Sequence, residues 1–139
     1  MNNRIFIVAH APLAQALKAC AMHVYPECAN EVLTLDVLAD DSPEQSLAAA
    51  QRLWAGVPDG DVLVLTDVLG ATPANVAQQW ARDRKAKIIA GVNLPMLLRS
   101  VCYRHEPLEG LLQRAMTGGA LGVVEITPPV GFIYSCRYP

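Results

Sequence analysis

The sequence predicts an α/β fold, in which an open, mainly parallel sheet carries helices on both faces. Short apolar runs rich in β-branched residues alternate along the chain with segments whose apolar residues recur at helical spacing, which is the pattern of repeated β-α-β units. Hydrophobic residues make up 53% of the chain and charged residues only 17%, a balance that favours a compact fold with well-buried strands. The chain of 139 residues is about the length of one domain.

The first half of the chain contains three predicted strands and two predicted helices. Residues 5–9 (IFIVA) read as a short buried strand, and the period becomes helical from Pro12 onward. Residues 32–38 alternate between apolar and polar and predict the second strand. Ser42 can cap the next helix, Pro43 suits its first position and Gln45 can close a capping box. Residues 62–65 (VLVL) are apolar on both faces and predict the third strand. The apolar face expected for the first helix consists of Leu13, Leu17, Cys20, Ala21 and Val24.

The second half continues the alternation. Residues 73–82 predict a third helix with Val76, Ala77 and Trp80 turned inward, and residues 87–92 predict a fourth strand. Two further helices are expected over 95–102 and 108–116. The pair of glycines at 118 and 119 is expected to end the last helix, after which residues 122–126 can form a final strand.

Composition argues against several classes of function. The formal net charge of −2 gives no electrostatic footprint for nucleic acid or for an acidic membrane surface. No stretch approaches the ~20 apolar residues that span a bilayer, and the run at 5–9 is too short for a signal peptide. We therefore expect a soluble, cytoplasmic protein without a transmembrane segment.

The sequence also predicts neither a metal site nor a nucleotide cofactor. The four cysteines form no CxxC pair and share no metal-ligand spacing with the three histidines. They are interpreted as buried or incidental thiols in a reducing compartment. Neither GxxxxGK[ST] nor a GxGxxG after the first strand is present.

Polar side chains are concentrated where three predicted strands end. Ligands of parallel α/β sheets bind beyond the carboxyl ends of the strands, so these residues are expected at one edge of the sheet. They are His10 after the first strand, Thr66, Asp67, Thr72 and Asn75 after the third, and Asn93 after the fourth.

This set suits phosphoryl transfer through histidine. A neutral imidazole nitrogen can attack a phosphoryl donor, and a carboxylate bonded to the other ring nitrogen would fix the tautomer. Asp67 is the candidate for that carboxylate, while helix N-terminal amides and Thr or Asn side chains would bind the phosphoryl oxygens. Other readings stay open at this point: His10 as a structural histidine, Asp67 as a cap, and the segments at Thr72 and Asn93 as ordinary helix starts.

Three segments together resemble a known family. They are residues 7–10 (IVAH), residues 64–67 (VLTD) with 70–75 (GATPAN), and residues 91–97 (GVNLPML), of which the last is the most specific. In order and spacing, residues 4–126 resemble the IIA components of the mannose class of the bacterial phosphoenolpyruvate-dependent sugar phosphotransferase system. On this resemblance, residues 1–126 form the IIA domain and residues 127–139 an unassigned tail, in which Phe132, Tyr134 and Cys136 have no interpretation.

The resemblance implies roles for the strand-end residues. It implies that His10 is phosphorylated, that Asp67 bonds its ring, and that the histidine phosphocarrier protein HPr is the donor. Family dimers exchange a C-terminal strand, which here would be about residues 122–126, so a homodimer is expected. The family usually has two glycines and often a serine where this chain has Gly70, Ala71 and Thr72. The expected phosphate-binding residues are Thr66, Gly70, Ala71, Thr72 and Asn75, and the expected partner-binding residues are Leu69, Asn93, Leu94, Pro95 and Met96.

Two uses of such a carrier are compatible with the sequence. The chain would pass the phosphoryl group to a separate IIB partner in sugar phosphotransfer, or its phosphorylation state at His10 would be read by a regulatory target. A related carrier that feeds dihydroxyacetone kinase lacks the Asn-Leu-Pro-Met segment at 93–96, which argues against that assignment. A nucleotide-binding flavodoxin-like protein is disfavoured because the phosphate-binding glycine pattern is missing.

Overall fold

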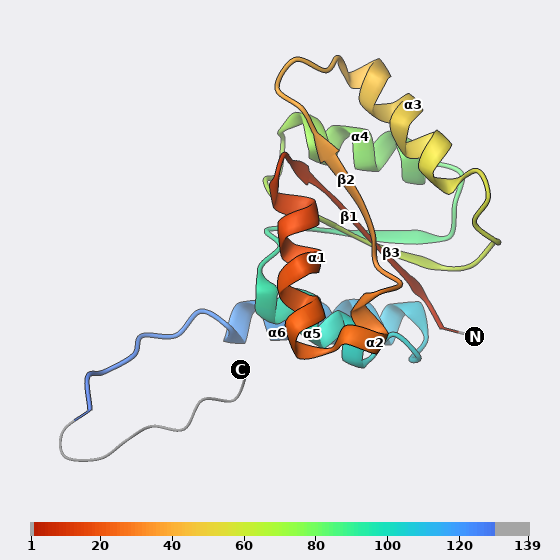
Figure 1. The fold of residues 1–139 in the computed structure, drawn as a ribbon. Coiled ribbons are helices and arrows are strands. Elements are labelled where there is room, and N and C mark those ends of the chain that lie inside the picture. The colour runs from red at the N-terminus through yellow and green to blue at the C-terminus, as the bar shows by residue number, and fades with distance from the viewer. Residues whose placement is uncertain (1, 130–139) are drawn as a thin grey trace.

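The computed structural model describes residues 2–129 and confirms the predicted α/β class. Four parallel strands form one sheet in the order β2-β1-β3-β4, with helices on both faces (Figure 1). The strands are β1 (Arg4–His10), β2 (Leu33–Val37), β3 (Val62–Thr66) and β4 (Ala86–Ala90). The helices are α1 (Leu13–Val24), α2 (Pro26–Ala29), α3 (Pro43–Trp54), α4 (Thr72–Ala81), α5 (Leu94–Cys102) and α6 (Leu108–Leu121).

Alternating side chains of the strands build two separate core layers. Ile5, Ile7 and Ala9 of β1 pack on one face with residues of α1, α5 and α6. Phe6 and Val8 of the same strand face the opposite layer, where they pack with α3 and α4. Phe6 lies edge-on to the rings of Trp54 and Trp80, whose centroids are 5.3 and 4.9 Å away. The strict alternation explains why the central strands are apolar on both faces.

The connections after β1 and β3 leave the sheet on opposite sides. β1 leads into α1, which belongs to one core layer, whereas the neighbouring β3 leads into α4, which belongs to the other. Val8 pairs with Thr66 near the ends of the two strands, so His10 and Asp67 emerge next to each other. This reversal of direction is the switch point at which open α/β sheets bind ligands.

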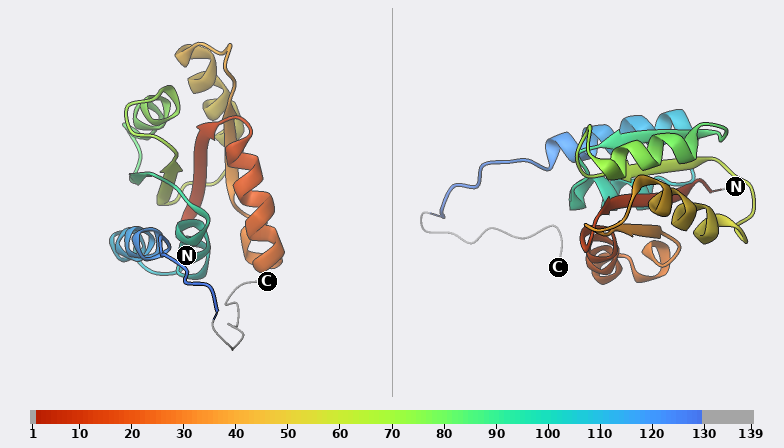
Figure 2. Two further views of the ribbon diagram at one scale, coloured as in Figure 1. Left: turned by 90° about the vertical axis from the view of Figure 1, so that its left-hand side faces the viewer. Right: turned by 90° about the horizontal axis from the view of Figure 1, so that it is seen from above.

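The end of α6 corrects two predictions. The helix does not stop before Gly118 but continues to Leu121, and residues 122–126 form no strand in the described chain. After α6, residues 122–129 run away from the body of the molecule (Figure 2). A β-carbon on Gly118 would lie 2.8 Å from Cβ of Arg99, and one on Gly119 would lie 2.7 Å from Cε of Met96. The two glycines therefore allow α6 to approach α5 closely, instead of breaking the helix.

Other local predictions have mixed outcomes. The capping box of α3 is present, since the Ser42 hydroxyl accepts from the Gln45 N–H and the Gln45 side chain accepts from the Ser42 N–H. The short helix α2 was not predicted because it is a single turn. Cys20, placed on the apolar face of α1 by its spacing, is exposed.

The structure also bears on membrane-spanning helices, metal-binding groups and cysteines. Among residues 2–129, no helix is long and apolar enough to cross a bilayer. In the same part of the chain, no group of three or more His, Cys, Asp or Glu side chains is arranged to hold a metal ion. Cys28 is half-buried and Cys102 exposed, and both are free thiols. Phe132, Tyr134 and Cys136 lie outside the described residues.

Candidate active site

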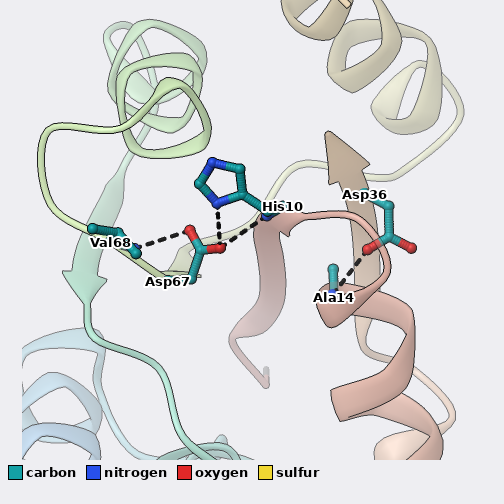
Figure 3. A network of polar contacts seen from close by, with 5 residues as sticks. All are labelled: His10, Ala14, Asp36, Asp67 and Val68. Carbon is teal, nitrogen blue, oxygen red and sulfur yellow. Dashed lines mark hydrogen bonds and ion pairs between the residues drawn. The ribbon is translucent and has the colours of Figure 1, made fainter. Parts of the chain in front are cut away.

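His10 and Asp67 meet at the carboxyl ends of β1 and β3 (Figure 3). The ring atom Nδ1 of His10 lies 2.7 Å from Oδ2 of Asp67, and the backbone N–H of His10 donates to the same oxygen at 2.9 Å. The other carboxylate oxygen, Oδ1, accepts the backbone N–H of Val68 at 2.9 Å. Three contacts thus fix the carboxylate, and the carboxylate fixes the imidazole.

The electrostatics of Asp67 favour the ionised carboxylate. Burial raises the pKa of Asp67. The hydrogen bonds from the backbone and ring of His10 and from the Val68 N–H lower the pKa by more than burial raises it, so the pKa lies below its ordinary value. An ionised carboxylate only accepts hydrogen bonds. The short contact therefore assigns a proton to Nδ1 of His10, and in the neutral ring this leaves a lone pair on Nε2.

The two partners differ in their access to solvent. The His10 side chain is 54% exposed, whereas that of Asp67 is 9% exposed. The second ring nitrogen of His10 points away from Asp67 (Figure 3). An oriented, solvent-facing imidazole nitrogen backed by a buried carboxylate is equipped for nucleophilic attack.

The loop between β3 and α4 supplies the surroundings of this pair. Gly70 has a φ of +85°, a left-handed conformation that glycine adopts without steric cost. Ala71 precedes α4 as its N-cap, and Thr72 is the first residue of the helix. Thr72 is half-buried and Asn75 is exposed, so both lie at the start of α4 where an anion would meet free backbone amides. Leu69 is 79% exposed.

Thr66 is placed differently from the prediction. Its side chain is 1% exposed, and its hydroxyl has no hydrogen-bond partner among the described residues. Its carbonyl oxygen accepts the N–H groups of Gly91 and Val92 at 2.9 and 3.0 Å. The residue thus ties the end of β3 to the loop after β4, and its buried side chain does not present the hydroxyl to a phosphoryl group at the surface.

The segment 93–96 forms the N-cap and first turn of α5, and Asn93 bonds this turn to α6. Oδ1 of Asn93 accepts the Met96 N–H at 2.9 Å, and Nδ2 donates to the Gly119 carbonyl at 3.0 Å. Met96 is 5% exposed and packs against Gly119. Its burial corrects the expectation that Met96 contacts a partner. Leu94 and Pro95 are half-buried, so part of each is open to solvent.

One residue near the site was missed in the sequence. Oδ1 of Asp36, near the end of β2, accepts the N–H of Ala14 at 2.9 Å (Figure 3). The same oxygen accepts the N–H of Gln15 at 3.4 Å. Asp36 therefore caps the first turn of α1, the helix that follows His10. The only sign of this role in the sequence is that Asp36 is an acidic residue near the end of a strand. Asp36 is 22 positions from Ala14, so the cap does not follow the short spacing by which helix caps are recognised in a sequence.

Comparisons of the sequence with known proteins find relatives over most of the chain. Residues 4–115 match the family model of the PTS system fructose IIA component. A protein of Bacillus subtilis, described as a PTS system fructose-specific EIIA component, is 29% identical over 111 residues, which cover 78% of this chain and 75% of that protein.

Solved structures show the same fold. The phosphotransferase system component EIIA of Streptococcus agalactiae superposes with a TM-score of 0.78 and 29% identity, over 88% of this chain and 95% of that one. The mannose/sorbose-specific IIA subunit of Enterococcus faecalis superposes with a TM-score of 0.85 and 22% identity, over 94% of this chain and 98% of that one.

Proposed function

Because this chain belongs to the family of PTS system fructose IIA components, which carry phosphoryl groups in sugar phosphotransfer, we propose that His10 is its phosphorylated residue. HPr is the proposed donor and a IIB protein the proposed acceptor. The observation that supports this most strongly is the 2.7 Å contact between Nδ1 of His10 and Oδ2 of Asp67, which leaves Nε2 open to solvent. The cytoplasmic location expected from the sequence stays a prediction.

The transfer step follows from that geometry. The lone pair on Nε2 of His10 forms a bond to the phosphorus of the donor's phosphohistidine, and the phosphorus–nitrogen bond of the donor breaks. The bonding pair returns to the donor imidazole, while the proton on Nδ1 of His10 stays in place. Attack through Nε2 places positive charge on the His10 ring, and the Asp67 carboxylate at Nδ1 stabilises that charge. Transfer to the IIB partner is the same step in reverse, with His10 as the leaving group.

The phosphoryl oxygens are assigned to the start of α4. The backbone amides of Gly70 and Thr72 lie at the start of this helix of 10 residues, and helix N-termini attract anions through free N–H groups and the helix dipole. The Ala71 N–H donates to the Val68 carbonyl at 3.2 Å, so Ala71 would contribute its small side chain and not its amide. The side chains of Thr72 and Asn75 add polar groups to this binding set. The Thr66 side chain takes no direct part, because it is buried.

Apolar side chains beside His10 provide a docking surface for the protein partners. Val68 is 54% and Leu69 79% exposed, directly after Asp67 in the chain. Asn93, Leu94 and Pro95 are half-buried at the end of the neighbouring strand β4. HPr and the acceptor would use this surface in turn, since both must bring their reacting group to the same ring nitrogen.

Phosphorylation of the purified protein tests this function. The protein is incubated with phosphoenolpyruvate, enzyme I and HPr, and its intact mass is measured under alkaline conditions. One acid-labile phosphoryl group is expected on the wild type and none on His10→Ala. His23→Ala and His105→Ala serve as matched controls, because both histidines are exposed. Normal labelling of the His10→Ala protein would disprove the assignment.

The second candidate function is regulatory. A phosphoryl group adds nearly two negative charges at neutral pH, and here it would appear on His10 at the end of β1, the strand next to β3, which the exposed Val68 and Leu69 follow. A target protein could read that charge. Capture experiments with the wild type, His10→Ala and His10→Asp separate the two functions. Capture of a IIB protein supports transport, whereas charge-dependent capture of a kinase or transcription regulator supports regulation.

We also propose that the protein is a homodimer. Val123, Val124 and Ile126 are 68–84% exposed and follow α6 in an extended segment. β4 is an edge strand of the sheet, and open edges pair readily with strands of another chain. Sedimentation velocity at micromolar concentration should show a dimer for the wild type and a monomer for Val124→Asp. Truncation after residue 126 should leave both the dimer and His10 phosphorylation intact. A monomeric wild type would contradict the proposal.

A further inference from the structure

A cavity lies at the amino end of the sheet. It has a volume of about 410 Å³ and is lined by Asn2, Asn3, Arg4 and Ile5 at the start of β1, together with Cys28, Glu31, Val32 and Arg104. β1 carries this cavity at its first residues and His10 at its last. In Figure 1 the start of β1 and the helix α2 lie at the end of the molecule opposite the start of α1. The cavity is therefore separate from the proposed phosphoryl-transfer site.

The guanidinium group of Arg104 is short of partners. Its side chain is 19% exposed, and Nε is fully buried without a hydrogen-bond acceptor among the described residues. Nη1 donates to the Cys28 carbonyl at 3.3 Å. Nη2 lies 3.9 Å from a carboxylate oxygen of Glu31, whose side chain is 68% exposed. A largely buried cation is costly unless it is paired and hydrogen-bonded, and these contacts satisfy only part of a five-donor group.

The backbone around Arg104 is held in place. The carbonyl oxygen of Arg104 accepts both the backbone N–H of Asn3 at 2.8 Å and the Asn3 side-chain amide at 2.9 Å. The Asn3 side-chain amide also donates to the Glu106 carbonyl. Arg104 is therefore fixed at the cavity wall by the first residues of the described chain, which is a condition for a preorganised binding group.

The charges around the cavity favour an anion. Arg4 and Arg104 line it with Glu31 as the single acidic side chain, although the whole chain has a net charge of −2. An adjoining cavity of about 360 Å³ shares Asn2, Cys28 and Arg104 and adds His105. Arg4 donates through Nε to the Pro58 carbonyl at 3.2 Å, whereas Nε of Arg104 has no acceptor among the described residues.

We propose that this cavity binds a small organic oxyanion, a carboxylate or a phosphate group held by Arg104. The planar guanidinium fork matches either group through paired hydrogen bonds. The amide of Asn2 adds a neutral donor, and the Glu31 side chain is 68% exposed, so its pairing with Arg104 is a contact at the solvent-facing side of the cavity. The volume lies in the range of sites for small molecules. The proposal is independent of phosphoryl transfer at His10.

Thermal unfolding with added anions tests the site at constant ionic strength. The probes are inorganic phosphate and citrate, with chloride as the reference anion. A ligand that binds only the folded state raises the melting temperature in a saturable way. We expect such a rise in the wild type, in His10→Ala and in Arg82→Gln, which removes an exposed arginine elsewhere. We expect its loss in Arg104→Gln.

A second variant covers the case in which Arg104→Gln fails to fold. Asn2→Asp changes an exposed residue at the cavity and adds a negative charge there, so it should weaken the response to both probes. A response to phosphate alone assigns a phosphate group, and a response to citrate alone assigns a carboxylate. The proposal is overturned if neither probe gives a saturable rise, or if Asn2→Asp and a folded Arg104→Gln respond as the wild type does. A response lost in His10→Ala would place the anion at the other site and would equally overturn it.

Discussion

Oδ2 of Asp67 accepts two hydrogen bonds from His10, one from its backbone N–H at 2.9 Å and one from its ring atom Nδ1 at 2.7 Å. The two residues are 57 positions apart in the chain. One carboxylate oxygen therefore fixes both the end of β1 and the orientation of the imidazole that β1 presents. The same contact leaves Nε2 as the nitrogen proposed to react, because Nδ1 donates its N–H to the Asp67 carboxylate.

Removal of the Asp67 carboxylate should slow phosphorylation of His10. Asp67→Ala leaves the ring without its orienting acceptor, and groups in such roles contribute ~10²–10⁴-fold to rates. The rate is measured as phosphate incorporation from phosphorylated HPr, with circular dichroism to confirm the fold. Asp83→Ala, an exposed aspartate after α4, is the control and should react at the wild-type rate. An unchanged rate in Asp67→Ala would reduce Asp67 to a cap of the Val68 N–H.

Asp67 should also make stability depend on pH. Its pKa in the folded protein is below the ordinary value of 3.8, so the unfolded chain takes up a proton first as the pH falls. The stabilisation from ionised Asp67 is thus complete above about pH 5 and is lost as the pH drops through 3.8 toward the folded-state pKa. In urea unfolding between pH 3 and 6, the wild type should have the higher free energy of unfolding, and its advantage over Asp67→Asn should become smaller as the pH falls. An advantage that stays constant or grows toward low pH would contradict the prediction.

Loss of the Asp36 cap should destabilise the start of α1. Asp36→Ala removes the acceptor of the Ala14 and Gln15 N–H groups, and losing such a cap costs about 1 kcal/mol in the free energy of unfolding. Thr34→Ala on the same strand is the matched control. Its hydroxyl donates only to the exposed Gln15 side chain at 3.0 Å, so we expect a change within about 0.5 kcal/mol. Equal effects of the two variants in urea titrations would show that Asp36 has no special role.

The two glycine environments in α6 should respond oppositely to alanine. A β-carbon on Gly119 would lie 2.7 Å from Cε and 3.2 Å from Cβ of Met96. Such overpacking should lower the free energy of unfolding by about 1–3 kcal/mol. In Gly110→Ala the nearest atom would be 4.0 Å away, so the higher helix propensity of alanine should stabilise the protein by up to about 1 kcal/mol. Thermal and urea unfolding of both variants measure the difference. Stabilisation by Gly119→Ala would show that α5 and α6 are not in close contact there.

Much of the architecture follows from sequence patterns. The buried run at 5–9, the capping box at Ser42 and the doubly apolar run at 62–65 each correspond to an element of the structure. Because the carboxyl ends of parallel strands share one edge of the sheet, the sequence alone predicts that His10 and Asp67 lie at the same edge. The role proposed for His10 rests on the resemblance of three motifs to a known family, because the position of a histidine at a strand end does not decide it.

Only the tertiary structure decided the contacts between distant segments. Thr66 and Met96 were predicted to bind phosphate and a partner because they lie near the carboxyl ends of strands. The side chains of both are buried by packing against neighbouring elements, which their positions in the sequence do not reveal. Gly118 and Gly119 read locally as a helix end, yet contact with Arg99 and Met96 of α5 keeps them helical. Periodicity along the chain reports which face of an element is apolar. Which side chain meets that face, and which ring nitrogen of His10 is left free, depends on residues brought together only by folding.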